Sequence, residues 1–332
     1  MKRLGALIAA VALIAGAWAL RDAIDGDDGG NGGDTGNRSE VPDQLRLRCA
    51  TSLGPVCDQI AEGRDDLDVE VEDPGITADA LAELPSGEDP GFDAWLTDGP
   101  WAAMVADDRE FAGAEADVLG TPSDVLGRSP AVLVIQSGRE TALTDACGGT
   151  ITWRCVGEQS DSVRIGLSPP DRGDGLVPLA EAVGGYFDAA DYSASDFNEP
   201  GFAGWFDSLT NLARSTPLGD RSALATAVVQ AGTFNVVGAL EAQSATQLRD
   251  GEAWSTIYPE PMTTADVQLV PRGGLPADDL LDRLDRGDTD VRSSLVDQGW
   301  RPATGQGDPD VAIPENSNLP SAGVLNALRD LW

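Results

Sequence analysis

Short apolar segments of strand length alternate along the chain with segments whose apolar residues recur at helical spacing. In the first part of the chain this pattern predicts strands at 45–50, 68–71, 92–96 and 129–135, with helices at 55–62 and 77–84 and another after Trp101. Pro55 stands at the start of the first helix, and Thr77 can cap the second. Strands that alternate with helices in this way indicate an α/β lobe with a largely parallel sheet.

The second half of the chain continues the alternation. A strand is expected at 163–167, a strand or turn at 231–238, and helices at 202–212, 221–229, 276–284, 291–298 and 319–332, with two more beginning at Leu176 and Leu240. Segments 256–260 and 266–271 are expected to carry the chain back to the first lobe and to be followed by a strand. We therefore expect two lobes joined by two crossover strands, with lobe one formed by 44–135 and 259–332 and lobe two by 136–258.

The N-terminus differs in composition from the rest of the chain. Lys2 and Arg3 precede an apolar run that ends at Leu20, and Ala-Trp-Ala at 17–19 can serve as a signal-peptidase site. The run is slightly shorter than a membrane span of about 20 residues, so 1–20 is interpreted as a signal peptide or an uncleaved membrane anchor. Residues 21–43, rich in Asp, Gly and Asn, predict a disordered acidic tether, which favours the anchor. Both interpretations place the remainder outside the cytoplasm, secreted or anchored to the cell membrane.

Charge and composition restrict the function. The chain has 56 acidic and 22 basic residues, a formal net charge of −34, and no histidine. Nucleic-acid binding needs a basic surface, so a nucleic-acid partner is not expected. The lack of histidine excludes Ser-His-Asp and Cys-His catalysis and histidine-ligated zinc. We expect a protein that is not an enzyme and holds no metal or cofactor, and we keep as an alternative a hydrolase that uses two carboxylates such as Asp98 and Asp171.

The four cysteines form two pairs with equal spacing, Cys49 with Cys57 and Cys147 with Cys155. Outside the cytosol such local pairs predict disulfides. Each would remove roughly 2–3 kcal/mol of unfolded-state entropy. Zinc is the alternative, although neither pair has the C-x₂-C spacing of a zinc site.

A polar corner joins a strand to a helix within 162–187. A loop of Ser, Pro, Asp and Gly occupies 168–175, and the helical spacing begins at Leu176. The first turn of a helix has unpaired amides and the positive end of the helix dipole, so such a corner can bind anions or hydroxyl-rich solutes. Similar corners follow strands at 51–52 and 98–99, and ligands of α/β sheets lie beyond the carboxyl ends of strands. For each corner alone, an ordinary turn is the alternative.

Four short motifs occur in the order found in a known group of proteins. They are Cys49-Ala50-Thr51-Ser52-Leu53, Asp93-Ala94-Trp95-Leu96-Thr97-Asp98, Ile165-Gly166-Leu167-Ser168-Pro169 and Gln298-Gly299-Trp300-Arg301-Pro302. In this order the chain from Leu45 to Trp332 resembles the bacterial extracellular solute-binding proteins, including actinobacterial ones, with the type 2 periplasmic-binding fold. The resemblance implies an α/β, two-lobed type 2 periplasmic-binding-protein-like fold with two crossover strands, after the N-terminal apolar segment.

The function expected from this resemblance is capture of a small-molecule ligand between two lobes, with an ABC permease as the partner that receives it. Hinge closure would be driven by the contacts that the ligand makes only in the closed state. The candidate ligand-binding residues are Thr51, Ser52, Asp98 and Ser129, faced by Asp171, Arg172, Gly173, Asn235 and Tyr258. Each also has a structural interpretation, such as a helix cap, a turn or a surface ion pair. The alternative function is a membrane-anchored docking protein of the cell envelope that retains the binding fold.

Overall fold

The computed structural model describes residues 41–115, 118–248, 253–285, 290–304 and 311–332. These residues belong to one compact unit, Ser39–Trp332. The predicted signal peptide or anchor (1–20) and most of the predicted tether (21–43) lie outside them. Within the described ranges, every helix is too short or too polar to cross a bilayer.

We call lobe one the elements that begin within the ranges expected from the sequence, 44–135 and 259–332. Its strands are β1 (Leu45–Ala50), β2 (Leu67–Glu72), β3 (Ala94–Asp98), β4 (Gly127–Gln136), β8 (Thr264–Pro271) and β9 (Arg301–Pro302). Its helices are η1 (Thr51–Leu53), α2 (Gly54–Ala61), α3 (Pro74–Glu83), α4 (Trp101–Ala112), α11 (Ala277–Leu284), α12 (Val291–Asp297) and α13 (Ala322–Leu331).

We call lobe two the elements that begin within the expected range 136–258. Its strands are β5 (Ile165–Gly166), β6 (Val236–Leu240) and β7 (Trp254–Ile257). Its helices are α5 (Ser137–Ala146), α6 (Trp153–Glu158), α7 (Gly173–Phe187), η2 (Ala194–Asn198), α8 (Phe202–Ser215), α9 (Ala223–Val229) and α10 (Glu241–Gln247).

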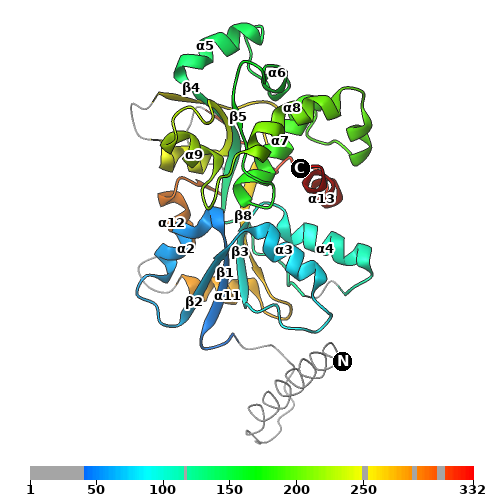
Figure 1. Ribbon diagram of the computed structural model, residues 1–332. Helices are drawn as coiled ribbons and strands as arrows, with labels where there is room; N and C mark the ends of the chain where they lie inside the picture. Colours follow the sequence, from blue (N-terminus) through cyan, green and yellow to red (C-terminus); the bar gives the residue numbers. More distant parts are fainter. Residues whose placement is uncertain (1–40, 116–117, 249–252, 286–289, 305–310) are drawn as a thin grey trace, which may run out of the picture. The chain divides into compact units, whose positions relative to one another are not determined.

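The long strand β4 connects the sheets of the two lobes (Figure 1). The strand order is β2-β1-β3-β8-β4-β6-β5, and β7 and β9 also pair with β4. Residues 127–130 of β4 pair with β8, whereas residues 131–136 pair with β6 and β7. The chain crosses once along β4 and returns between β7 and β8. The predicted two-lobed α/β fold with two crossings is therefore confirmed.

The predicted direction of the sheet is only partly right. Strand β1 pairs in parallel with β2 and β3, as the alternation of strands and helices suggested. Strand β8 runs antiparallel to β3 and β4, and β6 and β7 run antiparallel to β4. The remaining pair, β5 with β6, is parallel. The expectation of a largely parallel sheet is therefore wrong for the strands that pair with β4 and β8. The reason is that β8 enters lobe one from lobe two and so runs against β3.

Both predicted disulfides form. Cys49 bonds to Cys57 and ties β1 to α2, and Cys147 bonds to Cys155 and ties the end of α5 to α6. A disulfide over so short a loop limits the unfolded chain locally. The first one also fixes the connection that carries Thr51 and Ser52.

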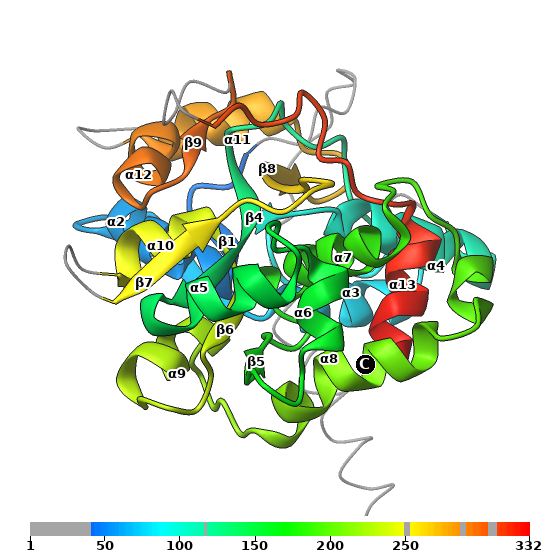
Figure 2. The same ribbon diagram turned by 90° about the horizontal axis from the view of Figure 1, so that it is seen from above.

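Neighbouring side chains of β3 enter different cores, because successive residues of a strand point to opposite faces. Leu96 packs with α2, α11 and α12, and Trp95 packs with α3 and α4. The second of these cores continues through α13 and α7 to α6 and α8 of lobe two. Helix α13 lies beside α4 and α7, as both views show (Figures 1 and 2). Apolar packing thus joins the lobes on the side of α13.

Candidate functional site

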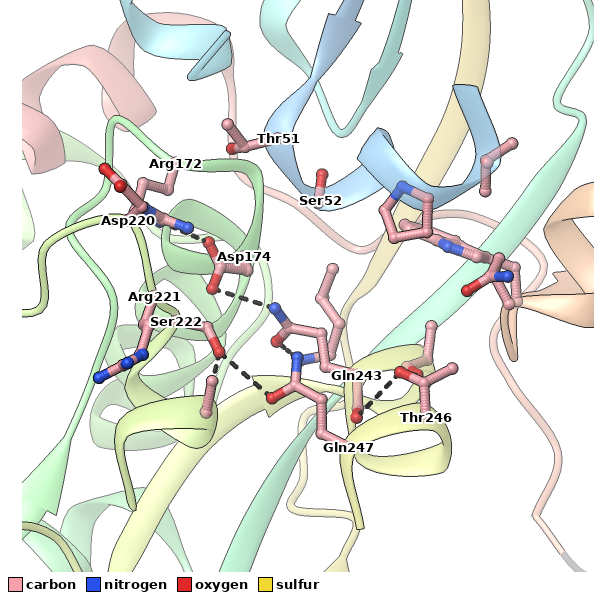
Figure 3. Close-up of a pocket in the computed structure, with 17 residues that line it drawn as sticks. Thr51, Ser52, Arg172, Asp174, Asp220, Arg221, Ser222, Gln243, Thr246 and Gln247 are labelled. Carbon is pink, nitrogen blue, oxygen red and sulfur yellow. Dashed lines mark hydrogen bonds and ion pairs between the residues drawn. The ribbon is translucent and has the colours of Figure 1, made fainter. Parts of the chain in front are cut away.

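A cavity of about 280 Å³ lies between the lobes (Figure 3). Lobe one contributes Thr51 and Ser52, which follow β1, and Gln298, which follows α12. Lobe two contributes Arg172, which precedes α7, and Gln243 and Gln247 of α10. Pockets that hold small molecules in α/β proteins commonly lie between such units, so we take this inter-lobe cavity as the candidate site.

The two hydroxyl groups of lobe one are held by carboxylates. Ser52 Oγ donates to Asp98 Oδ1 at 2.7 Å, and Thr51 Oγ1 donates to Asp73 Oδ1 at 2.6 Å. Both donor hydrogens are therefore used within the protein. The oxygen lone pairs remain able to accept a hydrogen bond from a solute.

The buried carboxylate of Asp174 organises the part of the site that lobe two provides. Its Oδ2 accepts from Ser168 Oγ at 2.8 Å and from Gln243 Nε2 at 3.0 Å, and its Oδ1 accepts from Arg172 Nε at 3.1 Å. Asp174 is 2% exposed. One side chain thus fixes the positions of the 168–172 loop, the first turn of α7 and the inner face of α10.

Asp98 has no exposed surface and lies where the lobes touch. Burial raises the pKa of its carboxyl group to about 6; the hydrogen bond from Ser52 opposes this rise and the nearby charge of Asp174 adds to it. A side-chain carbon added at Gly173 would lie 2.3 Å from Asp98 Oδ1 and 2.6 Å from Ser52 Oγ. Only glycine therefore fits at the start of α7 while the lobes keep this contact.

Five of the sequence-predicted residues meet at this junction. Thr51, Ser52 and Arg172 line the cavity, and Asp98 and Gly173 contact each other behind Ser52. These residues come from three separate corners of the chain, at the ends of β1, β3 and β5. The structure thus brings together the corners that the sequence singled out.

The other four predicted residues do not line the cavity, because the protein engages each of them elsewhere. Ser129 Oγ accepts from the backbone N–H of Ala242 at 3.0 Å, and Asn235 Oδ1 accepts from that of Arg164 at 2.8 Å. Tyr258 donates to Glu241, and Asp171 is paired with Arg329. Ser129 still bears on the site, since its bond to the first turn of α10 helps to place Gln243 and Gln247.

Sequence reasoning missed the polar residues that α10 and α12 bring to the cavity. Gln243 and Gln247 are four residues apart on α10, which places them on one face of the helix. Gln298 belongs to the Gln298–Pro302 motif that supported the resemblance, yet no binding role was expected for it. The spacing of the two glutamines was the available signal, but a polar helix face is by default a solvated one.

Direct bonds cross from one lobe to the other around the cavity. The backbone N–H of Gly75 donates to the carbonyl of Asp171 at 2.8 Å. Arg301, 4% exposed, pairs with Glu241 through two nitrogens. These contacts hold the lobes directly together, so the molecule has a closed arrangement.

Solved structures show which fold this is. The periplasmic binding protein AfuA of Actinobacillus pleuropneumoniae, with fructose-6-phosphate bound, is 12% identical, with a TM-score of 0.55 over 87% of this chain and 96% of that one. The sulfate-binding protein SubI of Mycobacterium tuberculosis is 14% identical, with a TM-score of 0.52 over 87% and 99% of the two chains. Trichodesmium IdiA (FutA), in complex with iron and citrate, is 11% identical, with a TM-score of 0.51 over 86% and 96%.

No protein-family model matches the sequence, and no curated protein matches it significantly. The likeness at 11–14% identity therefore establishes the fold and leaves the solute undefined. Fold alone does not determine function, which must be argued from the site.

Proposed function

We propose that this chain, whose fold is that of the type 2 periplasmic binding proteins, is an extracytoplasmic solute-binding protein and not an enzyme. It captures a small ligand in the inter-lobe cavity. The observation that carries the proposal is that both lobes supply polar side chains to one cavity, Ser52 and Gln298 from one and Arg172 and Gln247 from the other. A solute held there contacts both lobes at once, which is the requirement for ligand-driven closure.

The two carboxylates kept as a hydrolase alternative do not support catalysis in this cavity. Asp98 has no exposed surface, and Asp171 is bound by Arg329 on the outside of the 168–172 loop. Neither residue lines the cavity. General acid–base catalysis needs its groups within hydrogen-bond reach of the substrate, so binding without reaction is the better proposal.

Capture requires the lobes to separate and close again. Opening breaks the cross-lobe bonds of Asp171 and Glu241, and closing over a solute restores them and adds the solute's own contacts. A solute therefore shifts the equilibrium towards the closed state only as far as it binds the closed state more tightly than the open one. The crossing strand β4 and the segment between β7 and β8 are the natural hinges, because they alone connect the two sheets among the described residues.

A screen of sugars, amino acids, oligopeptides, oxyanions and metal ions by thermal denaturation tests this function. A compound present at about 100 times its Kd stabilises the protein by about 2.7 kcal/mol. The double variant Ser52→Ala/Arg172→Ala should lose this ligand-induced stabilisation while it still unfolds cooperatively.

The matched control is Ser195→Ala/Arg292→Ala, which removes the same two side-chain types at exposed positions of η2 and α12. It should keep the full ligand response. Equal responses of the two double variants to the same compound would contradict the assignment of the cavity as the binding site.

The same proposal includes the delivery of the captured solute and the cellular location of the protein. The captured solute would pass to an ABC-type importer, and the N-terminal segment would act as a cleaved signal peptide or as a membrane anchor. The mass of the mature protein distinguishes the two, because cleavage after Ala19 would remove the apolar run.

A second function is favoured by the ion pairs that join the lobes directly to each other. The Arg301–Glu241 pair and the Arg329 bridge would also suit an envelope docking protein that keeps the fold and has lost the need to open. In that case no compound of the screen would change the melting temperature, and small-angle scattering would give one closed shape under all conditions.

A further inference from the structure

The charged side chains on the wall of the inter-lobe cavity balance one another. The wall holds two arginines, Arg172 and Arg221, and two aspartates, Asp174 and Asp220, so its formal charge is zero. Arg172 lies 3.1 Å from Asp174 and 4.0 Å from Asp73, and only 13% of its side chain is exposed. Arg221 extends away from Gln243 and Gln247 (Figure 3). An anionic solute would therefore meet a guanidinium group that two carboxylates already neutralise.

Further negative charge lies directly behind this wall. Asp98 accepts the hydrogen of Ser52, and Asp73 accepts the hydrogen of Thr51. The chain as a whole also carries a formal charge of −34. An anion that gave up its hydration to enter the cavity would gain no net attraction in return.

The most buried carboxylate of the wall, that of Asp174, is also not free to bind a cation. Asp174 already accepts three hydrogen bonds, from Ser168, Arg172 and Gln243. Two of the donors share Oδ2, and the charged one occupies Oδ1. A cationic solute would have to displace the Arg172 guanidinium to reach it, which would leave that charge without its partner.

The groups that remain for a solute are uncharged and can donate or accept. Gln247 Oε1 accepts from Ser222 Oγ at 3.3 Å, so the two hydrogens of the Gln247 amide are left to donate. The Ser52 oxygen can accept, and the Gln298 amide, also from lobe one, can do both. A hydroxyl group on a solute both donates and accepts, and it matches such a set without any change of charge.

The remaining part of the wall is apolar and the space is small. Pro55 and Trp300 contribute apolar surface, and the buried side chains of Val56 and Leu240 lie behind it. The cavity of about 280 Å³ is just below the range of roughly 300–1,000 Å³ found for small-molecule sites. A solute with a carbon skeleton on one side and several hydroxyl groups on the other fits both features.

We propose that the solute is a small, uncharged, hydroxyl-rich molecule, the size of a monosaccharide or a short polyol. This inference rests on the proposed function and narrows it to one chemical class. Gln247 and Gln298 donate to its hydroxyl groups, and Ser52 accepts from one of them. The pairing of Arg172 with Asp174 makes the site select against phosphorylated and carboxylated forms of the same skeleton.

Matched pairs of probes test the class with the purified full-length chain. Each pair has one carbon skeleton without and with a charged group: glucose and glucose 6-phosphate, ribose and ribose 5-phosphate, glycerol and glycerol 3-phosphate, and myo-inositol and its monophosphate. Titration calorimetry should give, for at least one pair, a Kd at least tenfold lower for the uncharged member. Gln247→Ala should weaken that binding at least tenfold, whereas Gln230→Ala, at an exposed position after α9, should leave it unchanged.

Two results would overturn the inference. Tighter binding of the charged member in any pair shows that the cavity accepts anions, and the inference then fails while solute capture stands. If no member of any pair binds, the class is wrong. The wider screen of amino acids, peptides, oxyanions and metal ions then decides separately whether the chain captures a solute at all.

Discussion

Asp98 places an ionisable group at the contact between the lobes without access to solvent. It is fully buried, and its Oδ2 has no hydrogen-bond partner among the described residues. Burial is the main cause of its raised pKa, about 6 against an ordinary value of 3.8. The folded protein therefore binds this proton more tightly than the unfolded chain does. The stability that this group contributes is full below about pH 4 and is lost as the pH rises through 6.

Asp98→Asn should remove this dependence. A pKa shift of about two units corresponds to about 3 kcal/mol in the free energy of unfolding. As the pH rises from 4 to 7, the free energy of unfolding of the variant should therefore rise relative to that of the wild type by up to this amount. Urea unfolding at each pH measures the difference. Asp297→Asn, at an exposed position of α12, is the control. A difference between Asp98→Asn and the wild type that does not change with pH would contradict the burial of a charge at this contact.

The position of a site residue could be predicted where the local sequence indicates a turn from a strand into a helix. Ser52 and Arg172 follow short apolar segments and precede helices, and the structure places both on the cavity. The roles of Gln243 and Gln247 could not be predicted, because a polar residue on a short helix usually faces solvent. These two face the cavity only because lobe one packs opposite α10. Asn235 was taken for a binding residue, yet its side chain satisfies the N–H of Arg164 next to β5. The sequence does not show which backbone groups lack a partner.

Helix α13 is the element that ties the lobes together. It packs against α4 of lobe one and against α7 and η2 of lobe two. Arg329 extends from it to Asp79 on α3 at 3.0 Å and to Asp171 before α7 at 2.8 Å. In both views α2 and α9 lie on the other side of β4 from α13 (Figures 1 and 2). The lobes are thus joined on the α13 side, and separation is easier on the side of the cavity.

Arg329→Ala should loosen this connection. The two carboxylates are more than half exposed along their side chains, so solvent weakens each pair and the expected loss is about 1 kcal/mol in all. Urea denaturation measures it. Arg292→Ala removes an exposed arginine of α12 and should have no effect beyond about 0.5 kcal/mol. Equal losses in the two variants would show that Arg329 does not bridge the lobes.

Helices and strands could be predicted where the hydrophobic periodicity extends over many residues. The directions of the strands in the sheet could not. The closing helix expected at 319–332 is α13, Ala322–Leu331, and the strand expected at 45–50 is β1. Helices α5 and α6 were missed, because α5 has few apolar residues and α6 is short. The antiparallel course of β8 could not be inferred from alternation, since a strand has the same period of two whichever way it runs.

At the scale of the whole molecule, the closed arrangement depends on residues far apart in the sequence. Ser52 contacts Asp98, Asp98 contacts Gly173, and Glu241 pairs with Arg301. The two-lobed fold could be predicted from the order of strands and helices together with the resemblance. How closely the lobes meet could not, because no local pattern links position 52 to 173 or 241 to 301.

Hydrogen–deuterium exchange of the full-length chain, with and without a compound that raises its melting temperature, tests the central claim most directly. A solute held between the lobes should slow exchange in two segments together, 51–61 after β1 and 240–248 around α10, because it contacts both walls of the cavity. Helix α11, which lies outside the cavity, should exchange at an unchanged rate. Protection confined to one lobe, or to a surface away from both segments, would contradict capture between the lobes.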